Sequence, residues 1–257
     1  MSSYKPLQNL VVREFSNEKV QKSYEEATRE GLWKSEEKLF KKYFKPGSRI
    51  FDIGCGSGRT TFSLVKIGYK VIGIDLTPAM IKTAKRLSKE FRIKIDFRVG
   101  NAANLKIRNE SFDNALFSFN GWDQIPGEEN RLKALKEANR AIKPGGYFIF
   151  TSHLRQLNKK YFWFWIKQWL RLYIFKPIGL NIREIEYGDQ FFKRARIEEY
   201  ENEQFIHIPR LSKIIKQIKK AGFELVFYDK RNSIAKEDEK LITGNCTFFV
   251  CKKPILC

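Results

Sequence analysis

Residues 50–59 read Ile50-Phe51-Asp52-Ile53-Gly54-Cys55-Gly56-Ser57-Gly58-Arg59, and this stretch decides the fold. Its short apolar run ends in a carboxylate, and three glycines then alternate with small residues, a pattern that predicts a buried strand turning sharply into a helix. Glycine lets backbone N–H groups approach a ligand where any Cβ would collide. The positive N-terminal end of the helix attracts anionic groups. The stretch therefore predicts a site for a nucleotide-like ligand.

Two familiar glycine motifs do not fit this stretch. The nicotinamide fingerprint G-x-G-x-x-G needs a third glycine where this chain has Arg59, and the phosphate-binding motif G-x-x-x-x-G-K-[ST] is absent. A nicotinamide oxidoreductase is therefore disfavoured. The remaining pattern, D-x-G-x-G-x-G, identifies no ligand by itself, so its context along the chain has to decide.

A second strand is predicted at residues 69–75. It ends in Asp75, about twenty residues past the glycines, where an acid reaches ribose hydroxyls in doubly wound folds. Thr77 and Pro78 already supply an N-cap and first-turn pair for the next helix, residues 79–91, which leaves Asp75 free for a ligand. That helix has apolar residues at the spacing of one buried stripe.

Further strands are predicted at residues 95–99, 114–119 and 147–152, with a helix over residues 128–142. Together, the ordered motifs D-I-G-C-G-S-G, V-I-G-I-D, G-N-A, F-D-N-A and K-P-G-G resemble those of the class I S-adenosylmethionine-dependent methyltransferases. The resemblance begins near Trp33, runs to Ser152 and resumes at the C-terminal end. It implies transfer of a methyl group from S-adenosylmethionine (SAM), with S-adenosylhomocysteine as the product.

The resemblance also implies which residues bind the cofactor. These are Asp52, Gly54, Cys55, Gly56 and Gly58 for the methionine part, Asp75 for the ribose hydroxyls, Leu76, Met80, Asn101 and Ala102 for the adenine, and Ser118 and Phe119 near the transferred methyl. The chain departs from the family at Asn101, where an aspartate is usual. Because an amide carbonyl still accepts a hydrogen bond from an adenine amino group, Asn101 keeps the expected role.

The implied fold is an α/β, doubly wound three-layer sandwich with a mostly parallel seven-stranded sheet. An apolar helix face over residues 211–221, followed by strands at residues 223–228 and 246–252, predicts its last helix and its closing antiparallel hairpin. The expected domains are an N-terminal helical cap (1–45), a Rossmann-like SAM-binding domain (46–152 and 209–257) and an insertion that caps the substrate (153–208). The insertion is too long for a structureless connection in a compact domain.

The insertion contains the densest aromatic stretch of the chain, residues 161–175. At about fifteen residues it is shorter than the roughly twenty that span a bilayer. Its lysine flanks and interleaved tryptophans fit a helix at a membrane interface. They fit equally a lid over a lipophilic acceptor or a contact between subunits. The sequence leaves these interpretations open, and it indicates no oligomeric state.

Candidate catalytic residues follow the fourth and fifth strands, where ligands bind in doubly wound sheets. His153 is one candidate, because the intrinsic pKa of a histidine side chain suits a general base, and Asp123 lies in the same region. A strand-end histidine bonded to backbone and an aspartate that caps a helix are equally consistent with the pattern. His207 has a weaker claim, and the sequence shows no metal-ligand cluster.

Candidate substrate contacts come from the same region and from the N-terminal helices. They are Asn120, Trp122, Trp33 and Tyr24. By the resemblance, Tyr24, Trp33 and Glu36 cover the cofactor from above, although buried structural roles fit the two aromatic residues equally well.

The formal net charge is +20. Such a charge suits RNA or an anionic membrane, but the basic residues are spread along the chain and no RNA-binding module is evident, so a solvated lysine-rich surface is favoured. Four cysteines without paired spacing and the lack of a secretory segment predict a cytoplasmic protein, with peripheral membrane contact through residues 161–175 left open.

The expected function is transfer of a methyl group from SAM to a small or lipophilic acceptor at O, N or C. RNA methylation on the basic surface is the alternative within enzymes. A SAM-binding regulatory or scaffold protein without transfer activity is the alternative outside them. The acceptor itself is not encoded in any motif of the sequence.

Overall fold

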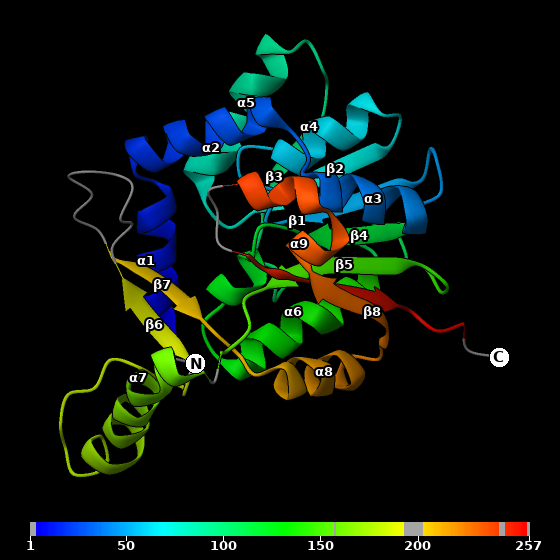
Figure 1. Ribbon diagram of the computed structural model, residues 1–257. Coiled ribbons are helices and arrows are strands. Elements are labelled where there is room, and N and C mark those ends of the chain that lie inside the picture. Colours follow the sequence, from blue (N-terminus) through cyan, green and yellow to red (C-terminus); the bar gives the residue numbers. More distant parts are fainter. Residues whose placement is uncertain (1–3, 157, 193–202, 242–244, 256–257) are drawn as a thin grey trace.

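A seven-stranded sheet forms the centre of the protein in the computed structural model, which describes residues 4–156, 158–192, 203–241 and 245–255. Figure 1 shows the sheet, whose order is β3-β2-β1-β4-β5-β9-β8. Strand β9 is antiparallel to both neighbours and the other pairs are parallel. The strands are β1 (Arg49–Ile53), β2 (Lys70–Asp75), β3 (Asp96–Val99), β4 (Asn114–Phe117), β5 (Tyr147–Ser152), β8 (Glu224–Lys230) and β9 (Thr247–Lys252). The expected doubly wound sheet with its closing antiparallel hairpin is confirmed.

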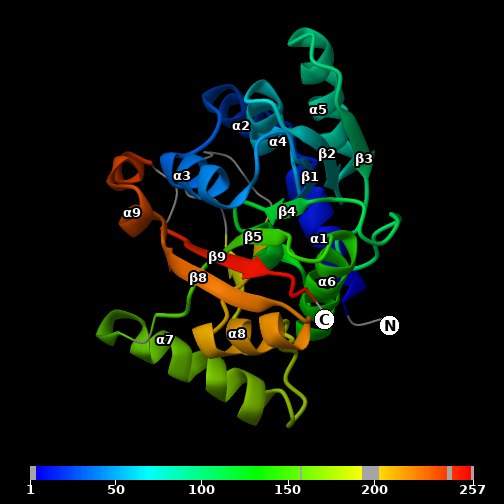
Figure 2. The same ribbon diagram turned by 90° about the vertical axis from the view of Figure 1, so that its right-hand side faces the viewer.

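Alternate residues of the central strands face opposite sides of the sheet and enter two separate cores. Phe51 and Phe148 pack on the side covered by α6 (Glu128–Ala141) and α8 (Leu211–Lys220). Ile50 packs on the other side, with α3 (Lys34–Tyr43) and α4 (Arg59–Lys66). Figure 2 shows these helices above and below the sheet. The three-layer sandwich follows from this alternation, and α5 (Pro78–Glu90) extends the α4 layer over β3.

The N-terminal region, from the first described residue onward, consists of three helices. Helices α1 (Lys5–Phe15) and α2 (Glu18–Glu30) precede α3, and Gly31, with φ of 87°, ends α2. Helix α3 begins with a capping interaction in which the Trp33 N–H donates to the Glu36 carboxylate at 2.9 Å. Helix α1 lies against the insertion, because Val11 packs on Phe205.

The insertion has secondary structure of its own, as its length predicted. It contains α7 (Lys159–Leu170), a π-helical turn η2 (Arg171–Phe175) and a hairpin of β6 (Asp189–Phe192) with β7 (Gln204–His207). Figure 1 shows α7 projecting below this hairpin, away from the main sheet. Parts of the expected 153–208 cap, residues 157 and 193–202, lie outside the described residues.

The remaining elements are short. The strand expected at 114–119 ends at Phe117, because Phe119 and Asn120 have positive φ angles of 56° and 60° and cannot continue an extended chain. A 3-10 turn, η1 (Gly121–Gln124), follows, and α9 (Arg231–Ile234) and η3 (Lys236–Lys240) follow β8. Among the described helices, none combines the length and the apolar character needed to cross a membrane.

Candidate functional site

The glycine loop connects β1 to α4. Gly54 and Gly56 have φ angles of 64° and 55°, a region that residues with a side chain rarely adopt. A Cβ on Gly54 would lie 2.2 Å from a ring carbon of Phe117, so a side chain there would displace that ring. The loop backbone therefore lies directly against the carboxyl end of β4.

A cavity of about 100 Å³ opens at the carboxyl ends of β1, β2 and β4. Six predicted cofactor residues line it, namely Gly54, Gly56, Asp75, Met80, Ser118 and Phe119. The Asp75 carboxylate accepts the N–H groups of Gly56 at 3.0 Å and of Thr77 at 2.8 Å. Burial raises the pKa of Asp75 above its ordinary value, and these two N–H groups oppose that rise.

Asp75 therefore has a role that the sequence did not predict. Thr77 is the N-cap residue of α5, as expected, but its side chain makes no capping hydrogen bond. Asp75 accepts from the start of α5 instead, and it ties that helix to the glycine loop. Each carboxylate oxygen keeps a further lone pair for a ligand hydroxyl.

A second cavity, of about 130 Å³, adjoins the first, because Val11, Gly121 and Gln124 line both. Three predicted adenine contacts lie in its wall, namely Leu76, Asn101 and Ala102. The Asn101 side-chain oxygen already accepts the Ala103 N–H at 2.9 Å, so it holds a local turn and offers the cavity an uncharged amide.

Two buried acceptors lie near these cavities without a hydrogen-bond partner in the described part of the chain: Gln124 Oε1 and Asn120 Oδ1. Gln124 lines both cavities. Buried polar atoms are almost always paired in native proteins. A ligand that donates hydrogen bonds from its amino groups would satisfy them, and SAM has such groups on both its methionine and its adenine.

Three of the predicted cofactor residues lie behind the cavities instead of in their walls. Asp52 is fully buried and accepts the hydroxyls of Thr60 at 2.5 Å and Thr61 at 2.6 Å, and burial raises its pKa to about 6. Cys55 packs into the core between α4 and α5, where burial raises the pKa of its thiol well above the usual range. Gly58 is the N-cap residue of α4, with φ of 100°.

Arg59, which stands where a nicotinamide site has its third glycine, forms a buried ion pair. Its guanidinium donates to both carboxylate oxygens of Glu36 at 2.6 Å, and the Ser118 hydroxyl donates to the same carboxylate at 2.7 Å. The guanidinium also lies 4.6 Å from the centre of the Trp33 ring. Glu36 and Trp33 thus attach the N-terminal cap to the sheet, and neither lines the two cavities.

His153 and Asp123, the two candidate catalytic residues, lie in contact. Asp123 is fully buried and accepts the backbone N–H of His153 at 2.7 Å, while Nδ1 of His153 lies 3.1 Å from the same carboxylate oxygen. The Ser152 hydroxyl donates to the other oxygen at 2.5 Å. Nε2 of His153 is 3.4 Å from the amide nitrogen of Asn120. A carboxylate that accepts from Nδ1–H leaves Nε2 as the unprotonated nitrogen of a neutral imidazole.

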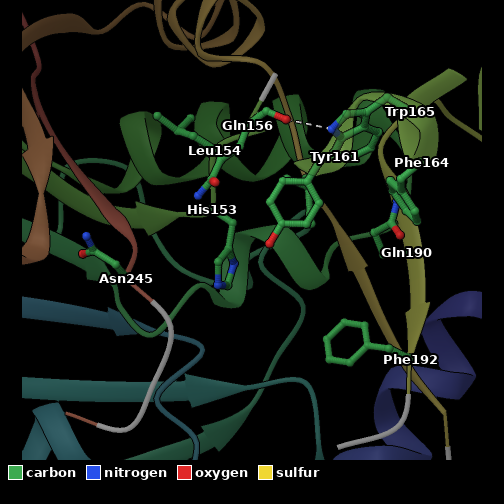
Figure 3. Close-up of a pocket in the computed structure, with 10 residues that line it drawn as sticks. His153, Leu154, Gln156, Tyr161, Phe164, Trp165, Gln190, Phe192 and Asn245 are labelled. Atoms are coloured by element: carbon green, nitrogen blue, oxygen red, sulfur yellow. Dashed lines mark hydrogen bonds between the residues drawn. The ribbon is translucent and has the colours of Figure 1, made fainter. Parts of the chain in front are cut away.

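His153 also lines the larger pocket of about 520 Å³ that Figure 3 shows. His153 comes from the end of β5, Tyr161, Phe164 and Trp165 come from α7, and Phe192 comes from the hairpin. In this view Tyr161 lies between His153 on one side and Phe164 and Trp165 on the other. Its size and aromatic walls are those of a site for an apolar small molecule.

The other predicted substrate contacts divide between the cavities and the core. Tyr24 lines the first cavity and meets the Phe119 ring edge-on at 5.6 Å between ring centres. Trp122 lies in the hydrophobic core, with its indole N–H donating to the carbonyl of Arg131 at 3.2 Å. Because that side chain is enclosed by the core, it reaches neither cavity nor pocket.

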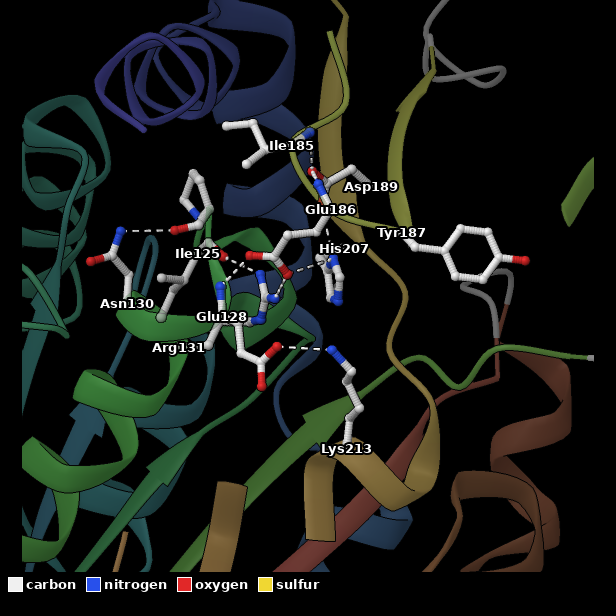
Figure 4. Close-up of polar contacts among 12 residues, drawn as sticks. Ile125, Glu128, Asn130, Arg131, Ile185, Glu186, Tyr187, Asp189, His207 and Lys213 are labelled. Atoms are coloured by element: carbon white, nitrogen blue, oxygen red, sulfur yellow. Dashed lines mark hydrogen bonds and ion pairs between the residues drawn. The ribbon is translucent and has the colours of Figure 1, made fainter. Parts of the chain in front are cut away.

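His207 belongs to a separate polar cluster, shown in Figure 4. Its Nδ1 lies 2.8 Å from Asp189, and Glu186 is close enough to form a three-residue set of metal-binding type. However, Arg131 pairs with Glu186 at 2.5 Å, and Asp189 accepts two backbone N–H groups. The pair of Arg131 on α6 with Glu186 therefore holds the insertion on that helix.

Several residues that line these sites carried no motif. Val11 and Phe15 of α1 close the first cavity, and Gln190 and Asn245 border the larger pocket. Each reaches its site through contacts between elements far apart in the chain. For Val11, the amphipathic pattern of α1 is a sequence signal that could have indicated a buried position.

Comparison with known proteins agrees with this geometry. Residues 51–150, which contain the glycine loop, Asp75 and the end of β4, match the family described as methyltransferase domain. They form a class I methyltransferase domain. A crystal structure of a SAM-dependent methyltransferase from Methanosarcina mazei superposes on the whole methyltransferase fold with a TM-score of 0.69 and 22% identity, covering 88% of this chain and 100% of that one.

Two of the curated relatives that match the chain are named methyltransferases. The demethylmenaquinone methyltransferase of Staphylococcus saprophyticus is 35% identical over 130 residues, which is 47% of this chain and 54% of that protein. The ubiquinone biosynthesis O-methyltransferase of Xanthomonas campestris pv. campestris is 29% identical over 114 residues, which is 44% and 45% of the two chains. The chain therefore spans about half the length of the curated relatives it matches.

Proposed function

We propose that the protein is a SAM-dependent methyltransferase that methylates a hydroxyl group on an apolar, ring-containing acceptor. The observation that carries this proposal is the arrangement of His153, which is bonded to Asp123 and lines the aromatic pocket of about 520 Å³. The methyltransferase domain and the two adjoining cavities beside the glycine loop support the choice of cofactor.

The residues around the cavities match the polar groups of SAM. Asp75 offers acceptors for ribose hydroxyls, and Gln124 and Asn120 offer buried, unpaired oxygens to amino groups. When bound, SAM supplies a methyl group on a positively charged sulfur. The chain's task is to hold an acceptor in line with that carbon, to exclude water and to remove a proton.

His153 is the proposed general base. Asp123 fixes the imidazole with Nδ1 toward the carboxylate, so Nε2 is the atom that takes the proton of the acceptor hydroxyl. Asp123 stabilises the imidazolium that results, since it is a buried carboxylate in direct contact with the ring. This arrangement suits O-methylation, because a hydroxyl becomes a strong nucleophile only as its proton leaves.

The names of the relatives support the proposed acceptor class. One is a ubiquinone biosynthesis O-methyltransferase and the other a demethylmenaquinone methyltransferase, so both names refer to quinones. The pocket of this chain has walls of tyrosine, phenylalanine and tryptophan, which suit a flat apolar ring. A hydroxylated aromatic or quinol compound is the acceptor we propose.

Two measurements test this function. Calorimetric titration with SAM should show binding, and no binding at millimolar SAM would refute the cofactor. Incubation with methyl-labelled SAM and a panel of hydroxylated aromatic and quinol compounds should yield labelled ether and S-adenosylhomocysteine. If SAM binds but no member of the panel or of a lipid extract is methylated, the non-enzymatic alternative replaces this proposal. Methylation of tRNA or rRNA instead, with steeply salt-dependent binding, would favour the RNA alternative.

A further inference from the structure

Helix α7 buries its glutamine and exposes most of its aromatic residues. Gln168 is only 4% exposed, and its amide donates to the Asp189 carbonyl at 2.6 Å and accepts the Gly188 N–H at 3.0 Å. By contrast, Phe162, Trp163 and Trp169 are 53%, 69% and 45% exposed. A water-soluble helix normally has the opposite arrangement, so the outer face of α7 is built for an apolar surrounding.

The outer apolar surface continues beyond the helix. Tyr173, Ile174 and Phe175 of the π-helical turn η2 are exposed, as are Ile178 and Leu180 after it. We call this surface, from Phe162 to Leu180, the α7 face. Contiguous exposed apolar surface of this kind marks a site of contact with a membrane or another macromolecule.

The charged residues in and beside the α7 face are basic along the sequence, and two of them, Arg171 and Arg183, pair with Glu184 at 3.0 Å and Glu203 at 2.7 Å. Residues 159–183 include Lys159, Lys160, Lys167, Arg171, Lys176 and Arg183 and contain no acidic residue. Lys159 and Lys160 occupy the first turn of α7, where the helix dipole would favour acids. Because these two lysines do not stabilise the helix, their position indicates a role in contact with a partner.

Contacts within the insertion hold α7 in this orientation. The Trp165 indole N–H donates to the Gln156 carbonyl at 2.8 Å, and the Tyr187 hydroxyl donates to the Trp165 carbonyl at 3.1 Å. The Arg155 guanidinium lies 4.7 Å from the Trp165 ring and 4.2 Å from the Tyr187 ring. The α7 face is therefore held outward by specific bonds on its inner side, and Figure 2 shows α7 along the outer edge of the molecule.

We propose that the α7 face docks on an anionic lipid bilayer, with its aromatic side chains at the interface and its lysines against the headgroups. Trp and Phe among Lys and Arg are the composition of interfacial helices. The lysines favour an anionic over a neutral surface, because each lysine near anionic lipid strengthens the binding constant about fivefold. The other flank of α7 lines the pocket of about 520 Å³ through Tyr161 and Phe164, so docking would bring that pocket to the bilayer.

The consequence for substrate entry rests on the proposed function: a lipid-soluble acceptor would pass from the bilayer into the pocket. Docking itself is independent of methyl transfer. It is measured without SAM or acceptor, so a failure of docking and a failure of the enzyme assay are separate results.

The first test is co-sedimentation of the full chain with vesicles. Binding is expected to vesicles of equal phosphatidylcholine and phosphatidylglycerol, and at least tenfold weaker binding to phosphatidylcholine alone. The variant K159E/K160E/K167E should bind at least about a hundredfold more weakly, because losing each of the three lysines costs about fivefold and each new glutamate is repelled by anionic lipid. The matched control reverses Lys82, Lys85 and Lys89, which are exposed on α5 at the far end of the molecule. Equal losses in both variants would show that net charge alone binds lipid, and would overturn the proposal.

The second test uses tryptophan fluorescence. Of the five tryptophans, Trp163 and Trp169 are exposed and both lie in α7, whereas Trp33, Trp122 and Trp165 are buried. Vesicles of brominated lipid should therefore quench the wild type strongly, and the double variant W163F/W169F much less. Binding without quenching would place the contact elsewhere and overturn the proposal.

A second copy of this chain is the competing occupant of the α7 face. Light scattering should give a monomer for the wild type, and the exposed-face variant F162S/W163S/W169S should keep that mass and its helical circular dichroism while losing vesicle binding. A wild-type dimer that this variant dissociates, with no vesicle binding by either, would assign the face to self-association instead.

Discussion

The cofactor end of the sheet and the insertion differ in how they build a site. At the cofactor end, the glycine loop, Asp75 and side chains of the N-terminal helices and η1 surround two small cavities of about 100 and 130 Å³, and the central contact joins Asp75 to Gly56, nineteen positions apart in the chain. In the insertion, aromatic side chains from α7 and the hairpin surround about 520 Å³. In the proposed function, a sequence motif forms much of the cofactor site, while side chains from distant parts of the chain form the acceptor site.

The largest effect is expected on removal of His153, the proposed general base. His153→Ala should lower kcat by about 10²- to 10⁴-fold, the usual contribution of a positioned general base. SAM affinity should stay within about twofold of the wild type, because His153 lines the acceptor pocket and neither cofactor cavity. Steady-state kinetics measures kcat of this variant, and calorimetry measures its affinity for SAM. An equal fall in SAM affinity would contradict the separation of the two sites.

The second prediction concerns the pH dependence of the free energy of unfolding, to which the buried Asp52 behind the glycine loop should contribute. Its pKa is about 6 in the folded protein against 3.8 when unfolded, because burial disfavours the charged form. A raised carboxyl pKa gives stability that is fully present below pH 3.8 and is lost as pH rises to about 6. Asp52→Asn should remove this slope and stabilise the protein by up to about 3 kcal/mol above pH 6.

Urea unfolding between pH 3.5 and 8 measures that difference. The Asp113→Asn variant is the control, because Asp113 is partly exposed, pairs with Lys143 and has a lowered pKa. A flat difference between Asp52→Asn and wild type across pH 4–6 would contradict the expected titration.

Asp75→Ala should weaken SAM binding about a hundredfold, or about 2.7 kcal/mol. The variant loses any contact to the ribose, and it also releases the Gly56 and Thr77 N–H groups that hold the loop. Calorimetric titration with SAM is the measurement. Asp113→Ala, a carboxylate removed at the opposite end of the strands, should bind SAM normally; a similar loss there would mean that general charge is responsible.

The smallest effect is expected in the insertion. Gln168→Ala should lower the stability of α7 by about 1–3 kcal/mol, since it leaves the Gly188 N–H buried without its partner. The acceptor KM should rise while SAM affinity is unchanged. Hydrogen exchange of the α7 amides, compared with those of α6, would show whether the change is local; equal deprotection of both helices would contradict an independent insertion.

The fold was predictable because its signals are local. The apolar run of β1, the glycine turn, the acid at the end of β2 and the Lys143–Gly146 turn each lie within a few residues, and all occur where expected. The strand boundary at Phe117 was missed, because left-handed angles at Phe119 and Asn120 depend on contacts of the folded chain, such as the Asn120 N–H donating to the Thr151 hydroxyl.

The site was predictable in part, for the same reason. Nine of the twelve expected cofactor residues line the two cavities, which are Gly54, Gly56, Asp75, Leu76, Met80, Asn101, Ala102, Ser118 and Phe119. Asp52, Cys55 and Gly58 support the loop from behind. Val11, Gln124 and Asn245 had no motif, because their positions depend on how α1, η1 and the start of β9 pack against distant elements.

The Arg59–Glu36 pair has a consequence for inhibitor selectivity. In phosphate-binding sites the start of the helix after a glycine loop compensates the negative charge of the ligand. Here the cation at that position is already neutralised by a bidentate carboxylate at 2.6 Å and is covered by Trp33. A pyrophosphate, as in NAD or ADP, therefore finds no free cation in the Arg59 side chain. Adenosine analogues with neutral or cationic 5′ substituents are the natural starting point for ligands of this protein.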